Sequence, residues 1–174
     1  MTREMQFDEA EYSVRQERVR QAMANRGIDL LVVSGPCNLY YLCGYDAWSF
    51  YVPQVLLLGV EGRPVWIGRA MDAAGWAITT RLGPKDIRAY GDEYVQSATR
   101  HPVDFILAEI RERGWGTARI GVELGSYYLG ASAYLALAEA FPDGQISDAS
   151  LLVNWVRAVK SPAEIHYMRQ AARI

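Results

Sequence analysis

The pattern of apolar and polar positions begins with a mostly polar stretch, residues 8–26, in which apolar residues recur every three to four positions. Gly27 follows it, where the C-cap glycine of a helix belongs. The aliphatic run 28–33 comes next and ends at the turn-forming residues 34–36. This pattern predicts a surface helix followed by a buried strand.

Two apolar segments in the middle of the chain, residues 55–59 and 65–67, are separated by the turn-rich quartet 61–64. Apolar runs joined by such a turn are typical of an antiparallel hairpin. We interpret residues 36–54, between the first strand and this hairpin, as a loop. The hairpin beside a helix-and-strand alternation predicts a mixed sheet.

The remaining segments alternate between helical and extended patterns. Helical spacing is expected over 71–81, 103–113 and 131–141, and extended structure over 87–90, 120–123 and 145–149, the last as an edge strand. This alternation is typical of α/β layering. We therefore expect one α/β domain over residues 1–160, with a mixed β-sheet flanked by helices.

The C-terminal part begins with an apolar helical stripe of Leu151, Leu152, Trp155, Val156 and Val159. A capping box at residues 161–164 then starts another helix, because Ser161 and Glu164 can each satisfy a backbone N–H of the first turn. The apolar face of that helix ends at Ile174 without a partner in sequence. We expect residues 161–174 to be the first helix of a missing further domain; the alternative is that this helix folds back onto the first domain.

Charge and hydropathy limit the classes of partner that this chain is expected to bind. The 18 basic and 20 acidic side chains are interleaved and leave a net charge of −2, so no basic stripe is available for nucleic acid. The longest apolar runs fall far short of the ~18 residues of a membrane span, and residues 1–6 lack the apolar core of an export signal. We expect a soluble, cytoplasmic protein without a membrane partner.

Motifs that carry chemistry are absent from the sequence. Residues 125–130 have P-loop glycine spacing without its lysine, and the turn after Val33 lacks the glycines of a dinucleotide site. His101 and His166 are expected to be capping or surface residues, and the carboxylates are scattered without metal-ligand spacing. We predict no catalytic and no metal-binding residue, and we interpret Cys37 and Cys43 as two buried thiols.

One segment of the predicted loop stands out for its aromatic content. Tyr, Trp and Phe crowd residues 45–51, directly after Tyr40 and Tyr41. Such a loop either packs under the domain or contacts a ligand or partner, because large exposed apolar patches usually mark binding sites. The residues alone leave both readings open.

Two motifs resemble one known family. The residues Pro36, Asn38, Tyr41, Leu42, Gly44 and Tyr45 resemble the P-x-N-x-x-Y-L-x-G-[FY] signature of creatinase, prolidase and aminopeptidase P N-terminal domains. The residues Arg157, Lys160, Ser161, Glu164, Ile165, Met168, Arg169 and Ala172 resemble the stretch that bridges into the catalytic domain of the same family. The two motifs stand in the family's order and cover nearly the whole chain.

The resemblance implies a non-catalytic N-terminal domain of a metal-dependent C–N hydrolase, with a ribonuclease H-like mixed sheet. In this family the following pita-bread domain binds two divalent metal ions through two Asp, one His and two Glu, and the metal activates the attacking water. Those ligands cannot lie in these 174 residues, so the parent would be the enzyme. The resemblance also implies contacts with the chain's own catalytic domain and a homodimer.

Within the family, residues 44–54 look most like ectoine hydrolases, which open a cyclic amidine. On this resemblance we expect the substrate-binding residues to be Tyr45, Trp48, Ser49, Phe50, Tyr51 and Gln54. The aromatic rings would wall the pocket, and the polar groups would donate hydrogen bonds. The alternatives are an Xaa-Pro dipeptidase or aminopeptidase, and a free-standing binding or assembly domain.

Overall fold

The first helix and strand form as their pattern predicts. The computed structural model describes residues 7–49, 51–142 and 145–174. Helix α1, Glu9–Asn25, is capped by the Asp8 carboxylate, which accepts a hydrogen bond from the Glu11 backbone N–H at 2.8 Å. Gly27 follows the C-cap residue Arg26, and its φ of 65° lies in the left-handed region.

The centre of the domain is a six-stranded sheet with the strand order β4-β3-β2-β1-β5-β6. Its strands are β1 Leu30–Val33, β2 Val55–Gly59, β3 Val65–Arg69, β4 Ile87–Tyr90, β5 Ile120–Val122 and β6 Ile146–Asp148. β2 pairs antiparallel with β1 and β3, whereas the β1–β5, β5–β6 and β3–β4 pairs are parallel. The predicted hairpin, the mixed sheet and the edge strand near the C-terminus are confirmed.

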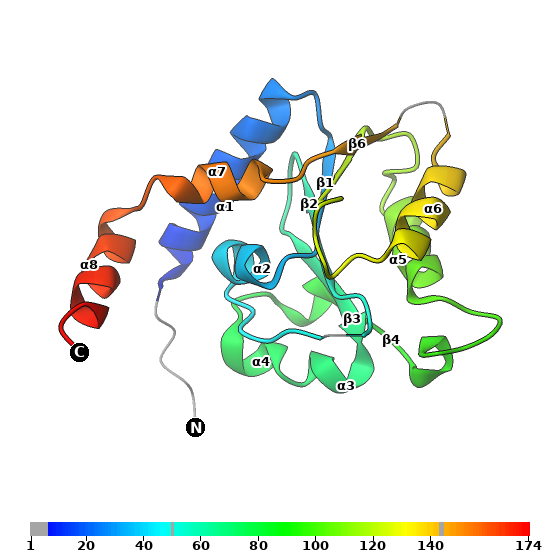
Figure 1. Ribbon diagram of the computed structural model, residues 1–174, viewed down its shortest axis with the longest axis horizontal. Helices are drawn as coiled ribbons and strands as arrows, with labels where there is room; N and C mark the ends of the chain where they lie inside the picture. The colour runs from blue at the N-terminus through cyan, green and yellow to red at the C-terminus, as the bar shows by residue number, and fades with distance from the viewer. Residues whose placement is uncertain (1–6, 50, 143–144) are drawn as a thin grey trace.

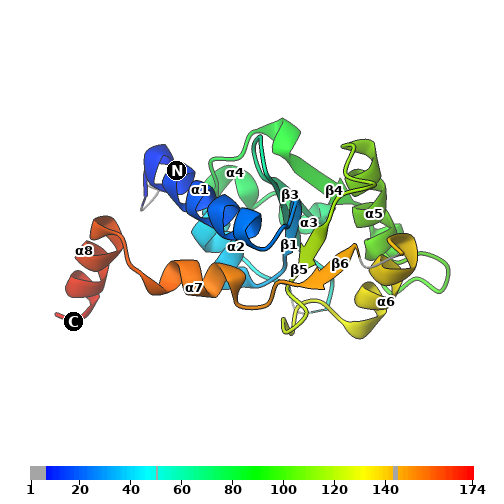
Figure 2. The ribbon, with the colours of Figure 1, turned by 90° about the horizontal axis from the view of Figure 1, so that it is seen from above.

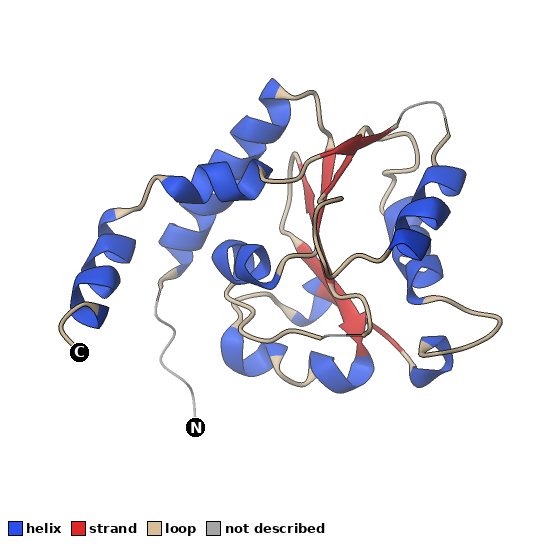
Figure 3. Cartoon of the chain, viewed as in Figure 1, coloured by secondary structure: helices blue, strands red, loops and turns tan. Residues whose placement is uncertain are grey.

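Helices cover both faces of this sheet (Figures 1 and 3). They are α1, α2 Pro36–Cys43, α3 Ala70–Ala73, α4 Trp76–Thr79, α5 Pro102–Glu112, α6 Ala131–Ala140, α7 Leu152–Ala158 and α8 Pro162–Ala171, with 3-10 turns at Pro84–Asp86 and Asp92–Tyr94. One core joins α1, α2 and α7 to the sheet, and the other joins α5 and α6 to its opposite face. The predicted α/β class, a mixed sheet flanked by helices, is confirmed.

The position of strand β1 in the sheet explains why its sequence is an unbroken aliphatic run. Leu31 and Val33 belong to the core under α1, α2 and α7, whereas Leu30 and Val32 belong to the core under α5 and α6. All four side chains are buried. A strand covered on both faces has no polar face, so its sequence shows no alternation.

Helix α2 corrects the interpretation of residues 36–54 as a loop. Pro36 occupies the first turn of the helix, where its missing N–H is not needed, and Gly44 ends it with a φ of 78°. Leu39 and Leu42 face the core. The prediction was wrong for residues 36–43 because the proline was taken as a turn signal and the left-handed C-cap glycine was overlooked.

The helix predicted over residues 71–81 is also corrected, because the structure has two short helices there, α3 and α4. Gly75 separates them, and Thr80 is already extended. Glycine is a poor residue for a helix interior, and the threonine side chains compete for backbone groups: Thr79 Oγ1 donates to the Gly75 carbonyl at 3.1 Å.

Helix α8 begins with the predicted capping box and projects from one end of the molecule (Figure 2). Ser161 Oγ accepts from the Glu164 N–H at 3.2 Å, and the Glu164 carboxylate accepts from the Ser161 N–H at 2.9 Å. Contacts to the rest of the domain run through Arg15–Glu164 at 3.4 Å and the Phe7–Tyr167 rings at 5.3 Å. No helix in the described ranges is long and apolar enough to cross a membrane.

Candidate functional site

The carboxyl ends of β1, β5 and β6 meet at one edge of the sheet, because these three neighbouring strands are parallel. After β1 the chain turns at Ser34 and Gly35 into α2, and after β6 it enters α7 on the same face. After β5, residues 123–130 lead to α6 on the opposite face. The candidate site lies where these connections diverge.

Glu123 is the first residue after β5 and lies at the base of this edge. Its side chain is only 4% exposed. The backbone N–H groups of Ser34 and Gly35 each donate to Oε2 at 2.8 Å, and Asn38 Nδ2 donates to Oε1 at 2.6 Å. Three N–H donors around a buried carboxyl group suit an ionised carboxylate, which can only accept.

Asn38 extends this cluster from Glu123 to helix α7. Its Nδ2 also donates to Asn154 Oδ1 at 2.9 Å, and its Oδ1 accepts from Arg157 Nη1 at 2.6 Å. We call Glu123, Asn38, Asn154 and Arg157 the polar clasp. It joins the end of β5, the first turn of α2 and helix α7 through one buried amide.

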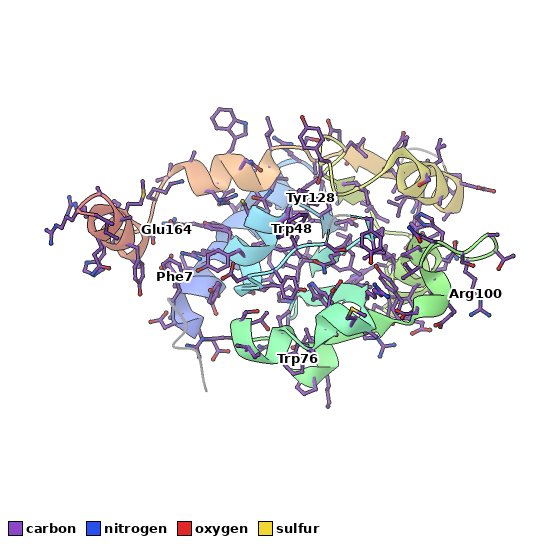
Figure 4. The ribbon with its side chains drawn as sticks, turned by 60° about the horizontal axis from the view of Figure 1, so that its bottom comes forward. Phe7, Trp48, Trp76, Arg100, Tyr128 and Glu164 are labelled. Atoms are coloured by element: carbon purple, nitrogen blue, oxygen red, sulfur yellow. The ribbon has the colours of Figure 1, made fainter. Side chains whose placement is uncertain are left out.

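The aromatic loop, residues 45–54, borders the same edge and presents two of its rings to the surface. Trp48 is 60% exposed and Tyr51 is 61% exposed. Trp48 meets Tyr128, from the segment after β5, edge to face with ring centroids 6.2 Å apart (Figure 4). Tyr51 Oη accepts from Arg69 Nη1 at 3.0 Å, and Arg69 pairs with Asp92 at 2.7 Å.

Two other predicted site residues, Tyr45 and Gln54, are buried together. Gln54 Nε2 donates to Asp72 Oδ2 at 2.9 Å and lies 3.4 Å from Tyr45 Oη. Burial raises the pKa of Tyr45 to about 12. Ser49 is half-buried, and Phe50 lies outside the described residues. The five described residues therefore divide between surface and core, and the role of all six in substrate binding stays a prediction.

Sequence reasoning missed the clasp residues Glu123 and Asn154. Glu123 was one of many scattered carboxylates, and no local pattern connects it to Asn38, 85 positions away. His101, in contrast, caps α5 as expected, with Nδ1 accepting from the Val103 N–H at 3.1 Å. In the described ranges, no three His, Cys, Asp or Glu side chains gather closely enough to hold a metal ion.

The two cysteines differ in exposure, which corrects the interpretation of both as buried. Cys37 is exposed on the first turn of α2, whereas Cys43 is buried at its end. Burial raises the pKa of the Cys43 thiol to about 12. The helix places these positions on different faces, which spacing within a supposed loop could not indicate.

We expect a thiol reagent such as Ellman's reagent at pH 8 to titrate one thiol quickly in the folded chain. The thiolate is the reactive form, and burial disfavours it at Cys43. Only the exposed Cys37 therefore reacts quickly. In denaturant both thiols react. The variant Cys37→Ser should lose the fast phase, and a fast phase that survives this change would contradict the assignment.

Known proteins are similar to this chain along nearly its whole length. The ectoine hydrolase of Halomonas elongata is 49% identical over 169 residues, which cover 97% of this chain and 42% of that protein. A hydrolase/peptidase of Sinorhizobium fredii is 44% identical over 98% of this chain and 44% of its own length. The chain thus spans less than half the length of either relative.

Solved structures share the fold at low sequence identity. Dipeptidase PepE from Mycobacterium ulcerans matches with a TM-score of 0.70 at 22% identity, over 92% of this chain and 40% of that one. A proline dipeptidase from Streptococcus pneumoniae matches with a TM-score of 0.65 at 17% identity, over 83% of this chain and 98% of that one. The family model of the creatinase/prolidase N-terminal domain matches residues 15–159. This chain therefore belongs to the creatinase/prolidase N-terminal domain family.

Proposed function

We propose that this chain is the non-catalytic N-terminal domain of a metal-dependent hydrolase that opens ectoine or a closely related cyclic amidine. The 49% identity to an ectoine hydrolase over 97% of the chain supports the substrate class. In this proposal the catalytic residues and two divalent metal ions belong to a domain that follows Ile174. The parent enzyme is cytoplasmic and homodimeric, and these 174 residues alone are inactive.

The observation that carries the proposed contribution of this domain is the exposure of Trp48 and Tyr51 at the carboxyl edge of the sheet. Contiguous exposed apolar surface often marks a site for a partner or a ligand. A small zwitterion needs apolar walls and a few directed polar groups, and the exposed rings of the aromatic loop would supply the apolar wall. The exposed rings would cover the substrate when the catalytic domain of the same or of a second chain approaches.

The substrate class is tested on the longer protein, by comparing kcat/KM for ectoine with kcat/KM for a Gly-Pro dipeptide. We expect ectoine to be preferred by a factor on the order of 100 or more, because the two substrates differ in shape and in charge placement. A preference for Gly-Pro would contradict the ectoine proposal and favour the alternative, an Xaa-Pro dipeptidase. The observation that supports this alternative is the fold shared with a proline dipeptidase.

The role of the aromatic loop is tested by Trp48→Ala in the longer protein. We expect KM for ectoine to rise by about tenfold, equivalent to ~1.4 kcal/mol, because an apolar wall of the pocket is lost. Metal content, measured by elemental analysis, stays unchanged. The same change at Trp155, which is exposed on α7 outside the loop, should leave KM within about twofold of the native value. Equal kinetics for native and Trp48→Ala protein would contradict the assignment.

A further inference from the structure

A second feature of the sheet edge is a cleft of about 390 Å³ between the connections that follow β1, β5 and β6. It is lined by Gly35, Asn38, Glu123, Gly125, Ser126, Tyr127, Tyr128, Ser150, Leu151 and Asn154. We call it the switch cleft. Its volume falls in the range of small-molecule sites in proteins.

The position of the switch cleft follows from the topology. The neighbouring parallel strands β1 and β5 send the chain to opposite faces of the sheet, to α2 and to α6. In open α/β sheets, ligands bind in the crevice outside the carboxyl ends of two strands whose connections diverge in this way. The cleft occupies this crevice, so its position alone makes it the leading candidate for a ligand site in the domain.

The polar base of the cleft selects against anions. The Ser34 and Gly35 N–H groups, which would otherwise meet an anion, are both taken by Glu123 Oε2. Oε1 accepts one hydrogen bond, from Asn38, and a carboxylate oxygen can accept two. Arg157 bonds Asn38 from α7 but does not line the cleft. Glu123 lines the cleft, and a ligand N–H that reached Oε1 would make its second hydrogen bond.

Two tyrosines form the walls. Tyr127 is 99% exposed, and Tyr128 is held in place by the edge-to-face contact with Trp48. Aromatic faces attract organic cations through the ring quadrupole, with about 0.5–1 kcal/mol for each exposed ring. Tyrosine walls above a carboxylate thus favour a positively charged, flat or methylated group.

The backbone beside these walls is strained. Leu151 has a φ of 63° although it is not glycine, and its side chain is 56% exposed in the cleft. A non-glycine residue in the left-handed region costs on the order of 1–3 kcal/mol, and such residues cluster at ligand sites. Leu151 is the N-cap residue of α7 and lines the cleft.

We propose that the switch cleft binds a small organic cation of the amidinium or ammonium class, with an N–H directed at Glu123 and its flat face against Tyr127 and Tyr128. This site is complete within the 174 residues. Binding there requires neither that the aromatic loop forms a substrate wall nor any segment after Ile174. The proposed cation site can therefore be tested independently of the proposed hydrolase activity.

The test is an NMR titration of the ¹⁵N-labelled chain with three probes of nearly equal shape: benzamidine, benzamide and benzoate. We expect benzamidine to shift the backbone amide signals of Gly125, Tyr127, Tyr128 and Leu151, benzamide to do so more weakly, and benzoate not at all. Binding of benzoate as tight as that of benzamidine, shifts confined to other parts of the chain, or no shifts up to about 50 mM benzamidine would overturn the proposal.

Two variants locate the contacts. Tyr127→Ala should weaken benzamidine binding by about threefold, as expected for the loss of one cation–π contact, whereas Tyr134→Ala on α6 should leave it unchanged. Glu123→Gln should abolish the preference for benzamidine over benzamide. Because Glu123 also holds the clasp, its variant is interpreted only if its NMR spectrum shows a folded chain. The three probes and the comparison of Tyr127→Ala with Tyr134→Ala decide the proposal without it. Equal affinities of the native chain and Tyr127→Ala would contradict it.

Discussion

Replacing Asn38 by leucine is expected to lower the free energy of unfolding by about 3 kcal/mol. The Asn38 amide is buried and connects Glu123, Asn154 and Arg157. Leucine fills a similar volume but offers no donor or acceptor. The Glu123 carboxylate then loses its shortest hydrogen bond, and the Arg157 guanidinium loses its acceptor. Most of the cost comes from these two lost charge-assisted hydrogen bonds, although the carboxylate keeps its two backbone donors.

The measurement is urea unfolding of the native chain and its variants, followed by circular dichroism. The matched control is Asn154→Ala, since Asn154 is exposed and makes one bond to the clasp, at 2.9 Å. We expect the control to lower the free energy of unfolding by less than about 1 kcal/mol. If Asn38→Leu cost no more than this control, the clasp would not be the connection that holds α7 to the sheet edge.

The second large effect is expected for Gly44→Ala, at the end of α2. Gly44 has a φ of 78°, and an added Cβ would lie 2.7 Å from Tyr12 Oη and 2.9 Å from the Thr79 carbonyl oxygen. The left-handed backbone costs a non-glycine residue about 1 kcal/mol, and the forced displacement adds roughly 1–3 kcal/mol. We therefore expect a loss of about 3 kcal/mol in the free energy of unfolding, together with a shift of the aromatic loop that follows Gly44.

Gly62→Ala separates these two contributions. Gly62 has nearly the same φ, 79°, but nothing lies within 4 Å of an added Cβ. The control should therefore lose only about 1 kcal/mol, from the backbone conformation alone. Thermal or urea unfolding of both variants measures the difference. Equal losses at the two positions would mean that the close approach of Tyr12 and Thr79 to Gly44 has no energetic consequence.

The fold could be predicted from the sequence wherever local physics decides. The unbroken aliphatic run of β1, the turn of the β2–β3 hairpin and the Ser161–Glu164 capping box are all signals within a few residues. Helix α2 was missed because its two ends are marked by a proline and a glycine, which also mark turns. The signals of helix α2 were as local as those of the elements that were predicted correctly, but they were interpreted as turn signals.

The candidate site could be predicted only in part. The aromatic loop was recognisable from its composition, but composition does not tell which side chains turn inward. Tyr45 and Gln54 are buried whereas Trp48 and Tyr51 are exposed. This division depends on the neighbouring sheet and on Asp72, which accepts a hydrogen bond from Gln54. The polar clasp and the switch cleft depend on Glu123 meeting Ser34, 89 positions away. Such long-range contacts follow from the strand order, which no local pattern fixes.

The most direct test of the central claim, that this domain contributes the aromatic loop to a substrate pocket, is a crystal structure of the longer protein with ectoine bound. We predict a ring carbon of Trp48 or Tyr51 within about 4 Å of the ligand, from the same chain or from its partner. A ligand enclosed only by residues that follow Ile174, with the aromatic loop more than about 10 Å away, would contradict the claim.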